Sequence, residues 1–494
     1  MSAADTHAIV IGSGLGGLAA AVRLGARGYR VTVLEQLDQA GGRAGVYRRQ
    51  GFVFDAGPTI ITAPFLLREL WSLCGCDFDE HVTLKPLDPF YRIRFDDGSN
   101  FEVSGDAGRM RDQVARLSAR DLLGYDKFLR LSEQLYRVAF EQLADRPFDS
   151  VFDMLRVLPD LIRLRSYRSV YALAASCVKE PKLRFALSFH PLFVGGNPFR
   201  TPAFYALISH LERQFGVHFA VGGTGSIVKG LAQLIDRQGG ELRLNSKAGE
   251  ILLEGAKVRG VRLVSGETLK ANIVVSNADS VSTYASLLPT GSSARAGIPG
   301  RLSMGLFVWY FGTSRIYPEV AHHTILVGPR YQELIEDIFE RKVLAEDFSL
   351  YLHRPTASDP SLAPAGSDAF YVLSPVPNLE AAIDWSRRAE EYRRAIGEFL
   401  QRTVLPGLEA CLTVSMVSTP DDFSLRYSAP KGCAFGLEPR LLQSAWFRPH
   451  NRSERYQGLY LVGAGTHPGA GVPGVLCSAR ILDKVVPDVG QSLI

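Results

Sequence analysis

The sequence predicts an α/β protein in which two parts of the chain are interleaved. A glycine-rich segment near the N-terminus lies between a short apolar run and an alanine-rich stretch. A second glycine-rich segment, residues 461–474, lies near the C-terminus. Strand-like runs return between the two after a long helical excursion. Glycine-rich segments so far apart indicate one ligand that is held from both ends of the chain.

The first glycine-rich segment is expected to form a strand, a tight turn and a helix. The apolar run 7–11 predicts the strand, and residues 18–26 predict the helix. Between them, Gly12 permits the turn, Gly14 lets the backbone approach a pyrophosphate, and Gly17 allows close packing of helix on strand. The phosphates would lie at the positive N-terminus of the helix.

A second strand and an acidic residue complete this unit. Residues 29–34 predict a strand that ends at Glu35, about 20 residues beyond the glycines, where dinucleotide-binding folds place an acid that binds the ribose hydroxyls. Because strand, glycines, helix, strand and acid occur in this order, a dinucleotide site is favoured over an ordinary glycine-rich turn.

The residues after Glu35 bear on which dinucleotide is bound. The motif 41–43, Gly-Gly-Arg, follows the acid, and the run 51–59 contains Gly57 and Pro58. This order resembles the FAD-binding superfamily of amine oxidases, Rab GDP-dissociation inhibitors and carotenoid desaturases. The resemblance implies FAD rather than a nicotinamide, with Arg43 near the flavin and pyrophosphate. Without the other motifs, Arg43 would be interpreted as a solvated loop residue.

Within that superfamily the chain resembles the bacterial phytoene desaturases over nearly its whole length. The segments that carry the resemblance are residues 188–199, 222–228, 275–279, 347–353, 444–451 and the closing glycines. Ala464 stands where amine oxidases usually have an acid, which favours the carotenoid branch and leaves that acid's ribityl contact without a counterpart. By resemblance, the backbone around Gly465, Gly474 and Val475 would contact the ribityl chain and the isoalloxazine ring.

The resemblance therefore implies a Rossmann-like FAD-binding domain of the GxGxxG/GGR flavoprotein type, interleaved with a mixed-sheet substrate domain and a helical, membrane-facing region. We assign residues 1–70, 222–290 and 436–494 to the FAD domain. Residues 71–221 and 291–435 would form the substrate domain, with helices at about 105–180 and strands of a sheet at 302–311 and 368–374. The predicted cofactor-binding residues are Gly12, Gly14, Gly17, Glu35, Gly42, Arg43, Gly57, Pro58, Gly463, Gly465, Gly474 and Val475.

Composition excludes several other classes of protein. The chain has 494 residues, 46% of them hydrophobic, which suffices for a large core and two or three domains. Its 55 basic and 51 acidic residues are nearly balanced, which disfavours a nucleic-acid partner. Six irregularly spaced cysteines and no leader before His7 predict a reduced, cytoplasmic protein. Neither Cys74 and Cys76 nor His322 and His323 complete a metal site in the sequence, so no metal is predicted.

One segment suggests contact with a membrane. No run of about 18 apolar residues predicts a spanning helix. Residues 151–168, however, mix arginines with Leu, Ile and Tyr, as interfacial helices do. On helical geometry Arg165 and Arg168 share a face whereas Arg163 points away, so a partly exposed structural helix is the alternative. We expect a cytoplasmic protein that associates peripherally with the inner face of the membrane.

The aromatic-rich segments 189–199, 204–205 and 306–311 are candidates to line an apolar channel, the alternative being plain core. The implied activity is FAD-dependent desaturation of phytoene to neurosporene or lycopene, acting also on partly desaturated carotenes. A hydride would pass to flavin N5 while a proton leaves the adjacent carbon. Quinone or oxygen would then accept the electrons.

Alternatives to this function share the same fold. Another carotenoid desaturase or isomerase would differ only in substrate, and a lipid-binding carrier would do no flavin chemistry. Asp153 with Arg156, at i,i+3 in an apolar run, is the candidate for a catalytic base, the alternative being an ordinary helix-surface ion pair. His190, beside a proline in an apolar stretch, is a further candidate or else a satisfied core residue.

Overall fold

A parallel five-stranded sheet forms the centre of one half of the molecule. The computed structural model describes residues 6–148, 150–289 and 300–489. The strand order is β19-β13-β1-β2-β9, with every neighbouring pair parallel. The strands are β1 (His7–Ile11), β2 (Arg30–Leu34), β9 (Glu241–Arg243), β13 (Ile273–Ser276) and β19 (Leu459–Leu461). They come from all three segments that the sequence assigned to the cofactor domain, although the domain boundaries themselves stay predictions.

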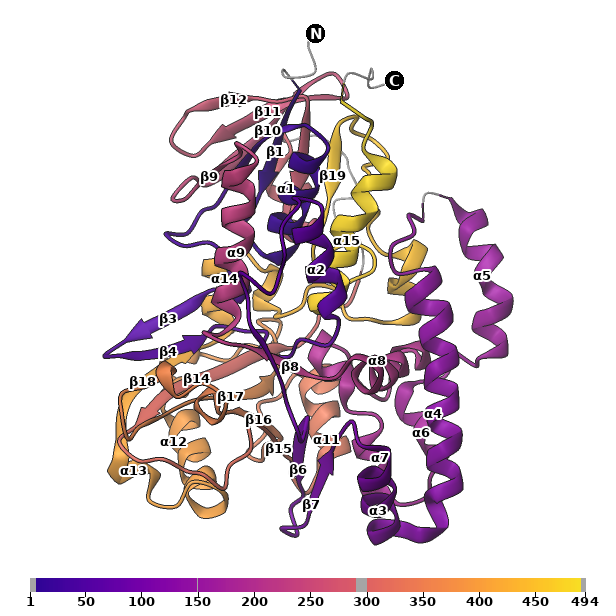
Figure 1. Ribbon diagram of the computed structural model, residues 1–494, viewed down its shortest axis with the longest axis vertical. Coiled ribbons are helices and arrows are strands. Elements are labelled where there is room, and N and C mark those ends of the chain that lie inside the picture. The colour runs from indigo at the N-terminus through magenta and orange to yellow at the C-terminus, as the bar shows by residue number, and fades with distance from the viewer. Residues whose placement is uncertain (1–5, 149, 290–299, 490–494) are drawn as a thin grey trace.

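The first glycine turn holds a helix against this sheet. Helix α1 (Leu15–Ala26) begins directly after the turn and packs beside α9 (Thr224–Arg237) and α15 (Val472–Val485), as Figure 1 shows. A Cβ on Gly17 would lie 2.0 Å from the carbonyl oxygen of Gly12, so a larger residue would push the helix off the strand. The predicted strand, turn and helix are thus confirmed.

A small antiparallel sheet covers the other face of the parallel sheet. It has the order β10-β11-β12, from β10 (Ala248–Glu254), β11 (Lys257–Leu263) and β12 (Thr268–Lys270). Ile251 and Val261 of this sheet pack in one hydrophobic cluster with Ile9 of the parallel sheet. The parallel strands are therefore covered on both faces, as their continuous apolar sequences require.

A seven-stranded mixed sheet organises the other half of the molecule. Its order is β18-β14-β17-β16-β15-β6-β7, with β15 and β6 parallel and the other pairs antiparallel. The predicted strands at 302–311 and 368–374 are confirmed within a few residues. The bounds are β6 (Tyr91–Arg94), β7 (Asn100–Val103), β14 (Gly305–Thr313), β15 (His323–Leu326), β16 (Leu350–His353), β17 (Asp368–Val376) and β18 (Leu412–Ser418).

Helix α12 (Trp385–Thr403) covers one face of the mixed sheet, and the other face looks toward the helical region and the cofactor half. The predicted helices at about 105–180 are confirmed as α3 (Ala107–Ser118), α4 (Leu122–Tyr136), α5 (Val151–Arg163) and α6 (Val170–Ala175). The remaining elements are α2 (Pro64–Ser72), α7 (Pro181–Ala186), α8 (Leu207–Phe215), α10 (Ser280–Ser282), α11 (Tyr331–Glu336), α13 (Leu408–Cys411), α14 (Pro420–Tyr427), β3 (Val46–Arg49), β4 (Phe52–Asp55), β5 (Leu84–Pro86) and β8 (His218–Ala220).

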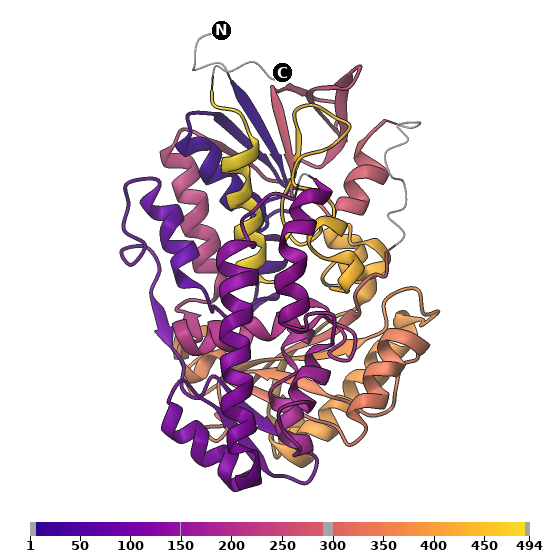
Figure 2. The same cartoon turned by 90° about the vertical axis from the view of Figure 1, so that its right-hand side faces the viewer.

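Helix α5 lies at the edge of the molecule, and Figure 2 shows it with α4 on the side that faces the viewer. It ends at Arg163, because Arg165 adopts a left-handed φ of 52°. The single helix expected over 151–168 is therefore too long. Within the described part of the chain, the structure has no helix that is long and apolar enough to cross a membrane.

The side chain of Asp55 links strand β4 to the start of helix α9. Asp55 ends β4, is 4% exposed, and accepts a hydrogen bond of 2.8 Å from the backbone N of Thr224, the first residue of α9. Backbone N–H groups favour the ionised form, but burial outweighs them and raises the pKa of Asp55 to about 7. The native protein therefore holds a proton here that the unfolded chain releases near pH 4.

Asp55→Asn should remove a pH-dependent part of the stability. Between about pH 4 and pH 7 the native state binds the Asp55 proton and the unfolded state does not, so this contribution falls as pH rises, by on the order of 4 kcal/mol in all. The melting temperature of the variant relative to wild type should therefore rise from pH 5 to pH 7.5. Asp96→Asn, at an exposed carboxylate, is the control. If the melting temperatures of wild type and Asp55→Asn change equally with pH, the raised pKa of Asp55 is contradicted.

Candidate cofactor and substrate site

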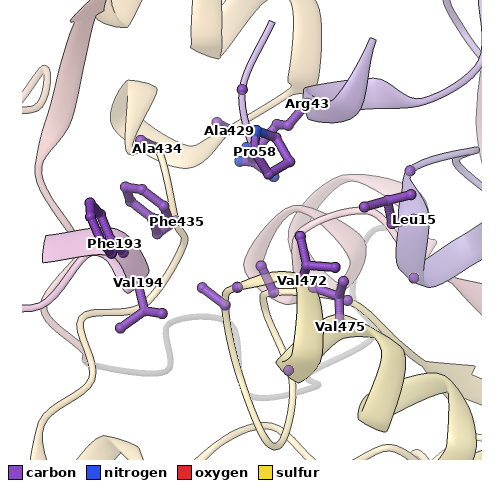
Figure 3. Close-up of a pocket in the computed structure, with 18 of the residues that line it drawn as sticks. Leu15, Arg43, Pro58, Phe193, Val194, Ala429, Ala434, Phe435, Val472 and Val475 are labelled. Carbon is purple, nitrogen blue, oxygen red and sulfur yellow. The ribbon is translucent and has the colours of Figure 1, made fainter. Parts of the chain in front are cut away.

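One continuous cavity joins the two halves of the molecule. Its volume is about 990 Å³, and its lining passes from the glycine turns of the parallel sheet to apolar side chains below the mixed sheet. Figure 3 shows Arg43 and Pro58 on one wall, Val472 and Val475 on another, and Phe193 toward the far end. A ligand-sized space thus begins at the predicted cofactor site and continues into an apolar region.

Most of the predicted cofactor residues line this cavity. Those that do are Gly12, Gly14, Glu35, Gly42, Arg43, Gly57, Pro58, Gly463, Gly474 and Val475. Gly17 and Gly465 instead lie behind the wall, where each allows close packing: a Cβ on Gly465 would lie 2.7 Å from the backbone N of Ser280. The roles of all these residues toward a cofactor stay predictions, and the structure supplies two tests of fit.

The first test of fit is the carboxylate of Glu35. It is 5% exposed and accepts hydrogen bonds from the backbone N and Oγ of Ser13, at 2.9 and 2.6 Å, and from the backbone N of Leu37 at 2.9 Å. A carboxylate has about four acceptor sites. The chain therefore fixes Glu35 in place and leaves it room to accept a hydrogen bond from a ribose hydroxyl.

The second test of fit is the guanidinium of Arg43. It lines the cavity, yet its buried Nε has no hydrogen-bond partner within the described chain. An unpaired buried N–H is costly, so a ligand with an acceptor atom at this place would stabilise the protein. The flavin and pyrophosphate of FAD carry such acceptors, and the residues present fit the cofactor.

The closing glycine segment forms the opposite wall. Helix α15 begins at the cavity, and its first residues, Val472 to Val475, line it. A Cβ on Gly474 would lie 2.6 Å from the carbonyl oxygen of Gly469, so the turn needs glycine there. The positive end of the α15 dipole therefore points at the space predicted for the isoalloxazine ring and favours negative charge on it.

The far part of the cavity is apolar, but only some predicted aromatic residues line it. Phe189, Phe193, Phe204 and Tyr205 do so. In strand β14 alternate side chains point to opposite faces, so Leu306 and Val308 face the cavity. Their neighbours Phe307, Trp309 and Phe311 pack under α12 as core. Both interpretations of the aromatic segments are thus correct, each for a different part of them.

Glu212 is a buried acid in the wall of the apolar part. Its Oε2 lies 3.1 Å from Nε2 of His190, and its Oε1 accepts a 2.5 Å hydrogen bond from the hydroxyl of Tyr91. Burial raises the pKa of Tyr91 well above its usual value, so it stays neutral and donates. His190 is thus a satisfied core residue, which packs behind the lining residues Glu212 and Phe189.

The structure pairs Asp153 with Arg146 and not with Arg156, so the helix-surface ion pair weighed as the alternative is wrong, while the catalytic role of the two residues stays a prediction. Asp153 accepts a 3.0 Å hydrogen bond from Nη2 of Arg146 and, at 3.3 Å, from the backbone N of Ser150, while Arg156 is exposed. Ser150 and Asp153 form a capping box at the start of α5, a pattern that their spacing in the sequence could have revealed. Met154 and Val157, not these charged residues, face the cavity, so the geometry does not support a catalytic base here.

A buried cluster of three histidines lies behind another wall, and only two of them, His322 and His323, were singled out from the sequence. His323 is the first residue of β15 and His322 directly precedes it, while His353 ends the neighbouring strand β16. One nitrogen from each ring lies within 4.8 Å of the others. Only the pairing of two strands, separated by a helix and a loop, brings these residues together.

Comparisons with known proteins agree with this geometry. The chain matches the model of the family described as flavin containing amine oxidoreductase over residues 15–481. It is 52% identical to a neurosporene-forming phytoene desaturase of Cereibacter sphaeroides, across 98% of this chain and 95% of that protein. It is 46% identical to a lycopene-forming phytoene desaturase of a Paracoccus species, across 98% of each.

Solved structures of lower identity share the fold. An oxidoreductase from Methanosarcina mazei aligns with a TM-score of 0.64 at 18% identity, covering 97% of this chain and all of its own. A putrescine oxidase solved with putrescine aligns with a TM-score of 0.64 at 14% identity, covering 98% of this chain and 99% of its own. These likenesses support the arrangement of the two halves.

Glu35→Gln should weaken FAD binding at least tenfold. Glutamine replaces one carboxylate oxygen by an NH₂ group, which cannot accept the hydrogen bond of the donor it faces, either Ser13 or Leu37, and the side chain loses the negative charge that would favour a ribose hydroxyl. A hydrogen bond to a charged group contributes about 1.5–3 kcal/mol. Flavin fluorescence during titration of the apoprotein measures the dissociation constant. Glu241→Gln, at an exposed carboxylate on strand β9 of the same sheet, is the matched control. Equal affinities for both variants would remove Glu35 from the cofactor site.

Proposed function

This chain belongs to the flavin-containing amine oxidoreductase family, and from its kinship with phytoene desaturases we propose that it desaturates phytoene to neurosporene, lycopene or both, using FAD. The observation that carries this function is the continuity of the cavity, which begins at the dinucleotide-binding glycines and ends among apolar side chains. A carrier without flavin chemistry has no use for the fixed Glu35 or the unpaired Nε of Arg43.

The chemistry that FAD supplies when bound is acceptance of a hydride at N5 from an allylic carbon, while a proton leaves the adjacent carbon and a double bond forms. The residues of the chain bind and orient. Glu35, Arg43 and the glycine turns would hold the cofactor at one end of the cavity. The apolar wall, which includes Leu306 and Phe189, would hold a hydrocarbon that offers no polar group for recognition and would keep water away.

The electrons must leave after each desaturation. We propose a quinone or oxygen as their acceptor. A membrane quinone suits a protein that works at a bilayer surface, and the exposed residues of α5 support that location.

We further propose that α5 rests on the membrane. Its residues Met154, Val157 and Leu161 line the cavity. A second face carries Phe152, Leu155, Leu158 and Ile162, which are 75, 53, 40 and 57% exposed. We call these four residues the outer face of α5.

Charged residues flank the outer face as they do in interfacial helices. At 100° per residue, Arg156 and Arg163 project from the same side of the helix, next to the outer face, and Arg163 is 70% exposed. Their heads would reach lipid phosphates while the apolar side chains enter the bilayer. Association with the inner face of a membrane from the cytoplasm is the location that this arrangement favours.

The purified protein, loaded with FAD, should convert phytoene in vesicles to carotenes with more conjugated double bonds. The visible spectrum reports the conversion, and separation of the pigments identifies neurosporene and lycopene. Oxygen and a quinone are each supplied, so that a missing acceptor is not mistaken for inactivity. Unchanged phytoene with flavin bound would overturn the substrate, and a protein that binds no flavin would favour a carrier.

The double variant Leu155→Glu/Ile162→Glu should bind vesicles at least tenfold more weakly than wild type. Burial of each apolar side chain contributes about 1.5–3 kcal/mol, and glutamate is also repelled by anionic lipid. Co-sedimentation with phosphatidylglycerol vesicles measures the bound fraction. Leu425→Glu on α14, also highly exposed but on the opposite side in Figure 1, is the control. Wild-type binding by the double variant would exclude α5 as the contact.

A further inference from the structure

A line of buried polar side chains leads away from the cofactor end of the cavity. Thr59, Tyr351 and Tyr371 line the cavity there. Oγ1 of Thr59 lies 3.1 Å from the hydroxyl of Tyr351 and 3.0 Å from that of Tyr371, which also donates to the carbonyl oxygen of Gly57 at 3.1 Å. These hydroxyls therefore lie beside the loop that contains Gly57 and Pro58, at the predicted flavin.

The line continues through the three histidines. The hydroxyl of Tyr351 lies 2.7 Å from Nδ1 of His323. Nε2 of His353 lies 3.1 Å from Nε2 of His322, whose Nδ1 lies 2.7 Å from Oγ of Ser358. His323 and His353 are fully buried, His322 is 7% exposed, and Ser358 reaches the surface.

One interval in the line has no direct hydrogen bond. Nε2 of His323 and Nδ1 of His353 lack partners within the described chain. The two rings are nearly parallel, with centroids 5.2 Å apart, and ring nitrogens of the cluster lie within 4.8 Å. A bridging water between these two nitrogens would satisfy both of them.

A divalent metal fits this cluster poorly. Lys85 and Arg354 place positive charge near His322, and the carboxylate that pairs with Nε of Arg354 at 2.9 Å, that of Asp368, also accepts a hydrogen bond from Oγ1 of Thr356 at 2.6 Å. A buried dication would lack a compensating anion, which is costly. Two histidine nitrogens also satisfy each other without a metal.

The environment keeps the rings neutral. Burial lowers the pKa of His323 and His353 well below the usual value and that of His322 to about 3. A neutral imidazole has one donor and one acceptor nitrogen, so it can take a proton on one side and release another on the opposite side.

Desaturation, if the proposed function holds, leaves one proton per double bond in a cavity that excludes water. We propose that Tyr351, His323, His353 and His322 conduct this proton from the cavity to solvent at Ser358. Tyr351 takes the substrate proton on its oxygen as its own proton passes to Nδ1 of His323. Each ring then takes a proton on the nitrogen nearer the cavity and releases one from its other nitrogen. The bridging water carries the proton from His323 to His353, and Ser358 delivers one proton to solvent, with no change in oxidation state.

His322→Ala tests the outer end of the line. Turnover of phytoene in vesicles should fall at least tenfold. Positioned proton transfer contributes about 10²-fold or more, and water that enters the cavity of the variant would replace part of this. Flavin content and melting temperature should change little. Added imidazole should restore turnover, whereas 1-methylimidazole, of similar shape but with no N–H, should not. Any other pattern, including equal rescue by both compounds, overturns the proposal.

Tyr351→Phe tests the inner end and does not depend on the alanine variant folding. The matched control is Tyr331→Phe, since the Tyr331 hydroxyl lines the same cavity and is buried without a hydrogen-bond partner in the described chain. Slower turnover and a larger solvent deuterium isotope effect in Tyr351→Phe, but not in Tyr331→Phe, support the proton line. Equal turnover and equal isotope effects in the two variants overturn it.

Two results separate other causes of failure. Wild-type protein that leaves phytoene unchanged in the same assay refutes the proposed function rather than the proton line. One equivalent of zinc in purified wild-type protein, absent from His323→Gln, would overturn the proton line in favour of a metal site.

Discussion

Three segments that are distant in the sequence meet around the side chain of Asn277. Its backbone N donates to the carbonyl oxygen of Ile11 at 2.8 Å, and its amide fills the space above both glycine turns. A Cβ on Gly16 would lie 2.7 Å from its Oδ1 and 3.0 Å from the Cα of Gly463, while a Cβ on Gly463 would lie 2.5 Å from the same oxygen. The two glycine turns can therefore approach each other closely, and both can line one cofactor site, because neither Gly16 nor Gly463 has a side chain at their contact.

The sequence allowed local units to be predicted, but not contacts between distant ones. Glycines, strand and Glu35 form a unit within 35 residues, and their spacing alone predicts their geometry. Helical spacing suggested Arg156 as the partner of Asp153, yet the partner is Arg146 in the segment just before the helix, so even a local pairing depends on how the chain enters α5. The histidine cluster depends on the register that sets His323 opposite His353, and local sequence carries no signal for which strands become neighbours.

The cavity separates two kinds of chemistry by position. Its glycine end offers N–H groups, a carboxylate and a guanidinium, which suit a charged dinucleotide. Its other end offers hydrocarbon side chains, with Glu212 as a buried exception that is held by Tyr91 and His190. A strand such as β14 serves both cavity and core because its alternate residues point to opposite faces, so one aromatic segment lines the cavity and also anchors α12.

Helix α5 is at once a wall of the cavity and an exposed surface, so a single helix stands between the apolar interior and whatever lies outside. A hydrocarbon that passes this wall from a bilayer never crosses water. For the membrane contact proposed above, the quantity that would govern loading is the surface density of the hydrocarbon in the leaflet, not its amount per volume of suspension. Diluting the vesicles would leave the rate per bound protein unchanged, whereas diluting the hydrocarbon with lipid would lower it.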